Sequence, residues 1–313
     1  MVQEYIIEEL NHGRKVIDFM NFKYFAFVSS VILLCTCLSI IFIKKFDWGI
    51  DFTGGTVIEM TLEKEPNLNI LRHAIKQSGY NNIVLQKFGN NHDIIIRIAS
   101  IQTLNNKIIF IVKQAVQGSV LIKRIEYIGP SIGKEMIQTG SIAILVALFC
   151  ILFYLGYRFE WRLAIGSIIA LIHDVIITLG VLSLFNIEID RTIIASLMSV
   201  IGYSLNDSIV ISDRIRENFQ NIIYGKPYDI INVSLTQTLQ RTIITSAITI
   251  AAIFILYIFG GAMLHSFSLT MLIGVTIGTI SSIYVASSLA LQLGIKREHI
   301  VLSKVEKEGA NLF

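Results

Sequence analysis

Charged residues are scarce in this chain of 313 residues, at 16% of the total against 53% hydrophobic residues. A water-soluble domain of similar length usually carries about a quarter charged residues. The mean hydropathy is +0.65, so most of the surface is expected to face something other than water. The net charge of +3 is small, and it gives no electrostatic support for a nucleic-acid partner.

Cysteine is also scarce, and Cys35, Cys37 and Cys150 all lie in apolar stretches. The sequence therefore predicts no disulfide framework and no metal site, and the three thiols are expected to act as small apolar side chains. Serine-nucleophile patterns, the HExxH metal motif and the glycine-rich phosphate loop are absent from the sequence. The chain is predicted not to be an enzyme and to use no cofactor.

Six apolar stretches are each long enough to cross about 30 Å of hydrocarbon. They are Phe22–Ile43, Ile137–Tyr157, Leu163–Phe185, Thr192–Ser212, Thr242–Gly261 and Phe267–Leu293. The first is too long for a signal-peptide core and lacks a cleavage site, so it is predicted to remain as an anchor. The sequence predicts an α-helical polytopic membrane protein with six transmembrane helices.

The chain divides into parts of different composition. We expect an N-terminal segment at 1–21, a first transmembrane helix at 22–43, a polar domain at 44–136, a five-helix bundle at 137–293 with a loop at 213–238, and a tail at 294–313. In the short loops and flanks, basic residues gather on one side: Arg14, Lys15, Lys23, Arg158, Arg162, Lys296 and Arg297. Because basic short loops stay in the cytoplasm, both termini and loop 213–238 are predicted to be cytoplasmic and 44–136 extracytoplasmic.

The polar domain alternates strand and helix patterns. Strand patterns cover Ile50–Leu62, Ile83–Phe88, Asp93–Ala99 and Val120–Ile128, and helical patterns cover Leu68–Gln77 and Leu104–Gln117. Gly89 to His92 form a hairpin-turn signal, and Gly79 and Gly118 follow the two helices. The order strand-helix-strand-strand-helix-strand predicts an α+β domain of the ferredoxin-like type.

Asp207 interrupts the fourth apolar stretch, roughly 9 Å inside its cytoplasmic end. A carboxylate at this depth must be paired, protonated or placed in a wet cavity, and it usually serves a function. Arg241 enters the bilayer from the same side in the fifth stretch, so a pair that forms and parts would let Asp207 take up and release a proton. A static salt bridge between two helices remains the alternative. A possible proton path includes Tyr203, Ser204 and Asn206.

Asp174 and His173 lie in the middle of the third stretch and would extend that path. Adjacent helical residues point about 100° apart, so purely structural hydrogen bonding is an equal alternative. The two buried aspartates also suggest an intramembrane aspartyl protease, but they lack the glycine-rich signature of that class. Just outside the first helix, Asp51, Gly54 and Gly55 indicate either a bulge that begins a strand or a hinge.

Several long segments resemble one known family. They are Trp48–Thr56, Ile201–Ile209, Ser212–Asn218, Ser234–Arg241, Phe267–Gly274 and Lys304–Gly309. Together they resemble SecF-type membrane proteins of the bacterial Sec export machinery, and the likeness covers nearly the whole chain.

The resemblance implies six helices and a periplasmic domain in the bacterial inner membrane. It also implies pairing with SecD to form the equivalent of one RND-type transporter, of which this chain would be half. The complex would work with the SecYEG channel and the SecA motor, and it would draw unfolded polypeptide outward at the expense of the proton gradient. In the family an aspartate of the fourth helix and an arginine of the fifth are tied to proton movement, and these fall on Asp207 and Arg241.

Two other functions remain open from the sequence. A stand-alone RND-type exporter of small molecules also uses intramembrane aspartate, but it needs about twice as many spans as this chain has. A scaffold protein without transport activity would leave the buried charges unexplained.

Overall fold

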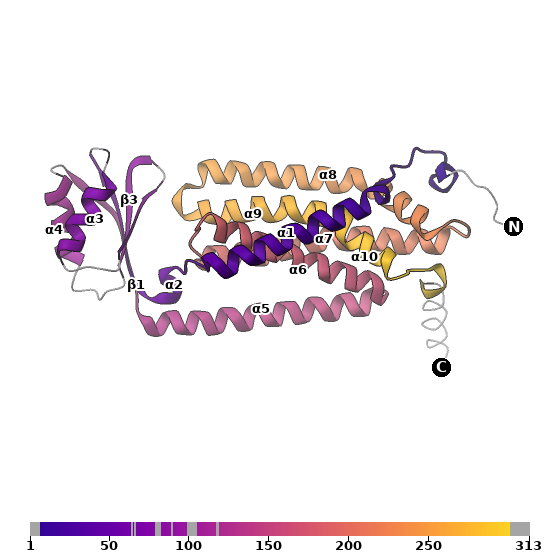
Figure 1. Cartoon of the computed structure of the whole chain (residues 1–313), viewed down its shortest axis with the longest axis horizontal. Helices are drawn as coiled ribbons and strands as arrows, with labels where there is room; N and C mark the ends of the chain where they lie inside the picture. The colour runs from indigo at the N-terminus through magenta and orange to yellow at the C-terminus, as the bar shows by residue number, and fades with distance from the viewer. Residues whose placement is uncertain are drawn as a thin grey trace.

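The computed structural model describes residues 7–63, 65, 67–78, 83–88, 90–98, 105–116 and 119–300. The molecule is elongated, with a small α/β domain at one end and a bundle of long helices that run along the long axis (Figure 1). Helix α1 begins, and α10 ends, at the end of the bundle away from that domain (Figure 1).

Six helical segments in the described part are long and apolar enough to cross a membrane. They are α1 (Lys23–Lys44), α5 (Pro130–Arg158), α6 (Trp161–Leu184), α7 (Arg191–Asn221), α8 (Pro227–Phe259) and a last span built from α9 (Gly261–Ser281), η4 (Ser282–Ala286) and α10 (Ser287–Gln292). This confirms the predicted polytopic fold. Within the last span, η4 is a π-helical turn.

Helices α7 and α8 extend well beyond the apolar stretches. Residues 213–238, expected as a connecting loop, are mostly helical, and only residues 222–226 join the two helices. The Asp190 side chain accepts a hydrogen bond from the Ile193 amide at 2.8 Å and so caps the start of α7. Pro227 occupies the first turn of α8, where its missing amide hydrogen costs nothing.

Helix α7 is central to the bundle and packs against α6, α8 and α9. Gly274 on α9 lies directly against the fully buried Val200 on α7. Helix α1 packs on α6, where Cys37 fills the space above Gly180. The small-filler prediction holds for Cys37, whereas Cys35 and Cys150 are exposed on outer faces of the chain.

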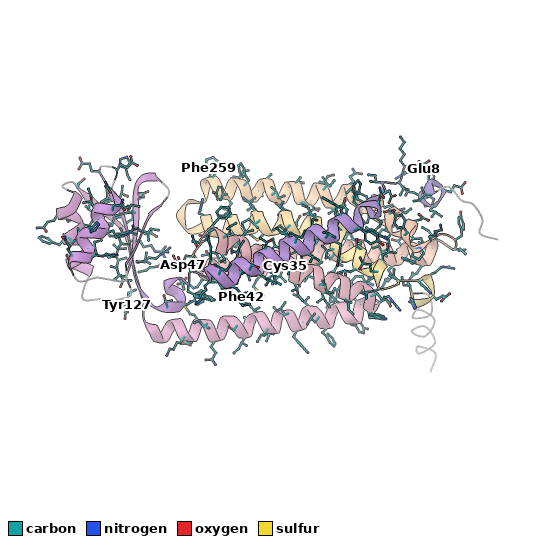
Figure 2. All side chains as sticks on the ribbon, in the orientation of Figure 1. Glu8, Cys35, Phe42, Asp47, Tyr127 and Phe259 are labelled. Carbon is teal, nitrogen blue, oxygen red and sulfur yellow. The ribbon has the colours of Figure 1, made fainter. Side chains whose placement is uncertain are left out.

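The outer faces of the bundle are strongly apolar. Phe42 on α1 and Phe259 on α8 are each 80% exposed, and Figure 2 shows both near the end of the bundle that adjoins the α/β domain. Apolar side chains on an outer surface of this kind suit lipid or another membrane helix.

The α/β domain contains β1 (Gly55–Leu62), α3 (Leu68–Gln77), β2 (Ile83–Phe88), β3 (Asn90–Ile98), α4 (Asn105–Val116) and β4 (Val120–Ile128). Its sheet has the order β2-β3-β1-β4, with every neighbouring pair antiparallel. This order matches the predicted ferredoxin-like unit. Alternate strand residues such as Ile58, Met60, Ile94 and Ile96 form its core beneath Leu71.

Two local predictions for this domain need correction. Ile50–Thr53 forms a short helix, α2, rather than the start of a strand, because the amides of Phe52 and Thr53 both bond to the Gly49 carbonyl. Strand β3 begins at Asn90, inside the segment expected to be a turn. The predicted turn and helix-ending residues Gly79, Gly89 and Gly118 lie outside the described residues.

On the sheet, Asp93 accepts hydrogen bonds from Thr61 at 2.6 Å and from Lys123 at 2.8 Å. Burial raises the pKa of the Asp93 carboxyl, but these two hydrogen bonds and the lysine charge outweigh burial, so the net pKa lies below its ordinary value.

Candidate functional site in the membrane bundle

Asp207 lies where α7 meets α8 and α9, and only 2% of its surface is exposed. The hydroxyl of Ser246 on α8 donates a long hydrogen bond of 3.5 Å to Asp207 Oδ2. The same hydroxyl lies 2.9 Å from Thr279 Oγ1 on α9, and it accepts a hydrogen bond of 3.2 Å from the Tyr203 hydroxyl. The hydrogen-bonded groups next to Asp207 are therefore neutral hydroxyls, of which only that of Ser246 contacts the carboxylate.

Arg241 is exposed on α8, and no ion pair to it is formed by any carboxylate in the described ranges. The direct Asp207–Arg241 ion pair that the sequence predicts is not formed in this conformation. The positive charge of Arg241 still acts on Asp207 through space. The two groups are near each other but not in contact.

The side of α7 that carries Gly202 and Asn206, and the Arg241 position on α8, are not covered by any other described helix; together these exposed positions are called the uncovered face. Gly202 and Asn206 on α7 and Arg241 on α8 are all exposed. Gly202 and Asn206 are spaced by four residues and so share one side of α7. A Cβ added at Gly202 would meet nothing within 4 Å, which leaves room for another helix to approach closely.

A second buried cluster surrounds Asp174 on α6, whose side chain is fully buried. Its Oδ2 accepts hydrogen bonds from Ser204 on α7 at 2.6 Å and from Ser281 on α9 at 2.7 Å. Its Oδ1 lies 3.1 Å from His173 Nδ1, and His173 Nε2 lies 2.6 Å from Ser30 Oγ on α1.

The structure divides the predicted path residues between these two clusters. Tyr203 belongs with Asp207, whereas Ser204 contacts Asp174 instead. His173 and Asp174 do meet although they are adjacent on one helix, because the imidazole ring is long enough to turn its Nδ1 toward the neighbouring carboxylate. Asn206 joins neither cluster and lies on the uncovered face. Their roles in proton movement stay predictions.

The segment around Asp51 is fixed to the bundle at several points. The Asp51 carboxylate accepts a hydrogen bond from the Arg191 amide at 3.0 Å and pairs with Arg191 Nε at 2.9 Å. The Gly49 amide donates to the Ile189 carbonyl at 2.8 Å, and a Cβ at Gly49 would come within 2.9 Å of that oxygen. Asp51 is thus an anchor at the start of α7.

Gly54 and Gly55 have φ values of +73° and +141°, which glycine adopts without strain. They turn the chain from α2 into β1, and the irregularity in the register of β1 lies at Glu59 and Met60 rather than at these glycines. Their action as a hinge stays a prediction. Within the described ranges, no group of three His, Cys, Asp or Glu residues is arranged to hold a metal ion.

Comparison with known families decides which family this membrane bundle represents. The family model described as "Protein export membrane protein SecD/SecF, C-terminal" matches residues 107–296, and "SecD/SecF GG Motif" matches residues 39–66. The chain belongs to the SecD/SecF family. The GG-motif match of this SecD/SecF chain includes Gly54 and Gly55.

Individual relatives agree with the SecD/SecF assignment. The chain is 58% identical to "Protein translocase subunit SecF" of Escherichia coli O157:H7, over 99% of this chain and 98% of the relative. It is 48% identical to the SecF subunit of Vibrio alginolyticus, over 95% of this chain and 96% of the relative.

The fold also matches a crystal structure of SecDF, "a translocon-associated membrane protein", from Thermus thermophilus, with a TM-score of 0.82 and 31% identity over 93% of this chain. A structure of SecDF in a "Super-membrane-facing form" matches with a TM-score of 0.68. The chain spans 39% of the Thermus SecDF chain.

Apart from Ser204 and Tyr203, sequence reasoning did not find the hydroxyl groups of the two clusters. Ser30, Ser246, Thr279 and Ser281 lie in apolar stretches that contain many other serines and threonines. Only the packing of α1, α8 and α9 distinguishes them. The sequence offers one signal for such hydroxyl groups, their occurrence in apolar stretches that would pack beside a span with a buried carboxylate. This signal does not distinguish the contacting serines and threonines from the others.

Proposed function

We propose that this chain is the SecF subunit of a bacterial protein translocase and couples proton movement to the export of unfolded polypeptide. Two full-length relatives are named as translocase subunits, and a similar structure is described as translocon-associated. A transport component needs no catalytic constellation of its own, and the proton gradient would supply the energy without a bound cofactor.

The observation that supports proton coupling most directly is the burial of the Asp207 carboxylate without contact to a cation in the described part of the chain. This carboxylate is buried within a membrane-length helix, and its hydrogen-bond partner among the described residues is the neutral hydroxyl of Ser246 rather than a cation. An ionised carboxylate left so would cost several kcal/mol. Asp207 is therefore protonated in this conformation and needs a nearby cation in any conformation where it is ionised.

Arg241 is the cation suited to that second conformation. It lies on α8 next to Asp207 and has no ion-pair partner among the described residues. A shift of α8 against α7 would bring the guanidinium to the carboxylate and expel the proton. A return to the present arrangement would allow Asp207 to take up another proton.

The uncovered face of α7 and α8 supports pairing with a second membrane subunit. Arg241 and Asn206 would be costly against lipid inside the bilayer. The similar SecDF chain is more than twice as long as this one, so we propose SecD as the partner that covers this face. Lipid would surround the remaining apolar faces, and no nucleic acid is involved.

We place the protein in the bacterial inner membrane, with both termini in the cytoplasm and the domain of residues 44–136 in the periplasm. The distribution of basic residues in the short loops supports this orientation. We further propose that the complex acts with the SecYEG channel and the SecA motor on a polypeptide in transit.

The decisive experiment is Asp207→Asn, measured in energised vesicles that contain the complete SecD-paired complex. The amide keeps the shape of the side chain and removes its titration, so gradient-driven export should be lost while subunit abundance and SecD recovery stay normal. Asp213→Asn is the matched control, because Asp213 lies further along the same helix in a half-buried ion pair with Arg158. Arg241→Met should cause the same loss as Asp207→Asn.

Normal gradient-driven export by Asp207→Asn at normal abundance would refute the proton role. Recovery of the wild-type chain as a homo-oligomer without SecD, together with an effect on small-molecule efflux, would favour a stand-alone RND-type exporter instead.

A further inference from the structure

The cluster around His173 is separate from the one around Asp207. Ser30, His173 and Asp174 form a continuous row in which a hydroxyl contacts one ring nitrogen and a carboxylate contacts the other. Within the described residues, no hydrogen bond joins this row to Ser246 beside Asp207. The bundle therefore contains two distinct protonatable centres.

The His173 cluster lies beside a crevice at the outer surface of the described bundle. This crevice, of about 330 Å³, opens between α1 and the last span, with His173 and Ser30 in its lining. Ser29, Ser281 and Tyr284 supply the other polar groups of its wall, and the remaining lining is apolar. This volume has room for several water molecules, and its polar groups provide partners for them.

The π-helical turn η4 forms part of the same wall. Tyr284 and Val285 belong to both η4 and the crevice lining. A π-turn widens a helix locally, and such turns occur frequently at functional sites. The local widening thus coincides with the opening that leads to His173.

We propose that His173 is a second protonation site, reached through this crevice, and that Asp174 holds the ring and balances its charge. The proposal rests on the proposed proton-coupled function and adds a site to it. In the neutral state His173 Nδ1–H donates to Asp174 Oδ1, and Nε2 accepts from the Ser30 hydroxyl. When a proton from crevice water binds Nε2, that nitrogen becomes the donor and the Ser30 oxygen becomes the acceptor. The proton leaves by the reverse step.

The charges around the pair make its protonation depend on water. From the helices packed against the pair, α1, α7 and α9 contribute only the hydroxyls of Ser30, Ser204 and Ser281. Tyr284 is the only other titratable group in the described crevice lining. With neutral His173 and ionised Asp174 the site carries one negative charge and no cation, which a dry interior disfavours. A dry crevice therefore favours one added proton, and entry of water allows its release.

A serine–histidine–aspartate row also suggests acyl transfer, but the surroundings of Ser30 do not suit that chemistry. Ser30 lies inside the regular helix α1, where the neighbouring backbone amides are already bonded to preceding carbonyl groups. No free pair of amide donors is therefore available near Ser30 in the described helix to hold an oxyanion.

The first test measures gradient-driven export against pH for the full chain in its SecD-paired complex. His173→Gln should lower export at least tenfold at neutral pH and flatten the pH profile. His265→Gln is the control histidine variant, because His265 stacks on Tyr257 outside both clusters, and it should match the wild type. Ser29→Leu, which narrows the crevice without changing the row, should slow export several-fold.

The results separate this inference from the proposed function. Export that survives Asp207→Asn removes the proposed function whatever His173 does. Loss in Asp207→Asn together with an unchanged rate and pH profile in His173→Gln overturns the second site alone. Labelling of Ser30 by a fluorophosphonate probe would overturn the proton assignment in favour of acyl transfer.

A spectroscopic test remains if His173→Gln fails to assemble. The chain has six histidines, so replacing His12, His73, His92, His265 and His299 with glutamine leaves His173 alone. Its ring-nitrogen NMR signals in the full complex should change between the singly and doubly protonated forms across the pH range from about 5 to about 9. A single protonation state throughout this range would overturn the proposal.

Discussion

The contact between Gly274 on α9 and Val200 on α7 allows a quantitative test of how tightly the bundle is packed. A Cβ at position 274 would lie 2.3 Å from Val200 Cγ2 and 2.5 Å from Cγ1, far inside the ordinary carbon separation of about 3.5–4.0 Å. Gly→Ala in an unhindered helix stabilises by about 1 kcal/mol, whereas overpacking costs about 1–3 kcal/mol. Gly274→Ala should therefore be less stable by about 1–3 kcal/mol than an unhindered Gly→Ala variant.

Gly140→Ala on α5 is that reference, because a Cβ there would meet nothing within 4 Å. The assay is reversible denaturant-induced or thermal unfolding of the purified full chain in one mild detergent. Val200→Ala alone should also destabilise, by about 2 kcal/mol, because it removes two fully buried carbons. Combined with Gly274→Ala it should relieve the clash, since the nearest remaining side-chain atom is Val200 Cβ at 3.0 Å.

The double variant is the critical measurement. Its loss of stability should be smaller than the sum of the two single losses by about 1–3 kcal/mol. Strict additivity, or a Gly274→Ala variant as stable as Gly140→Ala, would mean that α7 and α9 do not approach as closely as described.

Three further outcomes are expected. Asp51→Ala should lower the free energy of unfolding of the full chain by about 1–3 kcal/mol, because the Arg191 amide and guanidinium both lose their acceptor. Thermal unfolding measures this change, and Asp51→Asn should lower the free energy of unfolding by less. Since the pKa of Asp93 is lowered by folding, its stabilisation is present above the ordinary carboxyl pKa and is lost as pH falls through the lower folded value. The protection factors for hydrogen exchange in β1 and β3, which correct for the intrinsic slowing of exchange in acid, should therefore fall below about pH 4, and should fall less in Asp93→Asn. In a version lacking the native cysteines, a cysteine at the exposed Lys76 should react with an impermeant thiol reagent added outside the cell membrane. A cysteine at the exposed Asn221 should not react, and the reverse labelling pattern would invert the proposed orientation.

The sequence was sufficient for features that depend on local pattern. Apolar length located the six spans, and alternation located the strands of the α/β domain. Burial of charge in an apolar run singled out Asp207 and Asp174. Each of these signals is contained in a few consecutive residues, so no knowledge of packing was needed.

Features that depend on contacts between distant segments were not accessible. Ile50–Thr53 consists mainly of residues that favour strands, yet it is helical because its surroundings are fixed by bonds from Gly49 to the chain before α7. The rotation of α8 that leaves Arg241 exposed instead of paired is likewise a matter of packing. For the same reason, Ser30 gave no sign in the sequence that it meets His173, which lies far along the chain.

The anchoring of Asp51 to Arg191 has a mechanical consequence. The segment that begins the α/β domain is tied to the first residue of α7, and the same helix carries Asp207. Sixteen residues of helix separate the two points, a stiff rod of about 24 Å. Because the connection is short and hydrogen-bonded, a pulling force on the domain would tilt or shift helix α7 instead of stretching a flexible linker. Force applied to the domain on one side of the membrane would then be coupled mechanically to the ionisation of Asp207 inside the membrane.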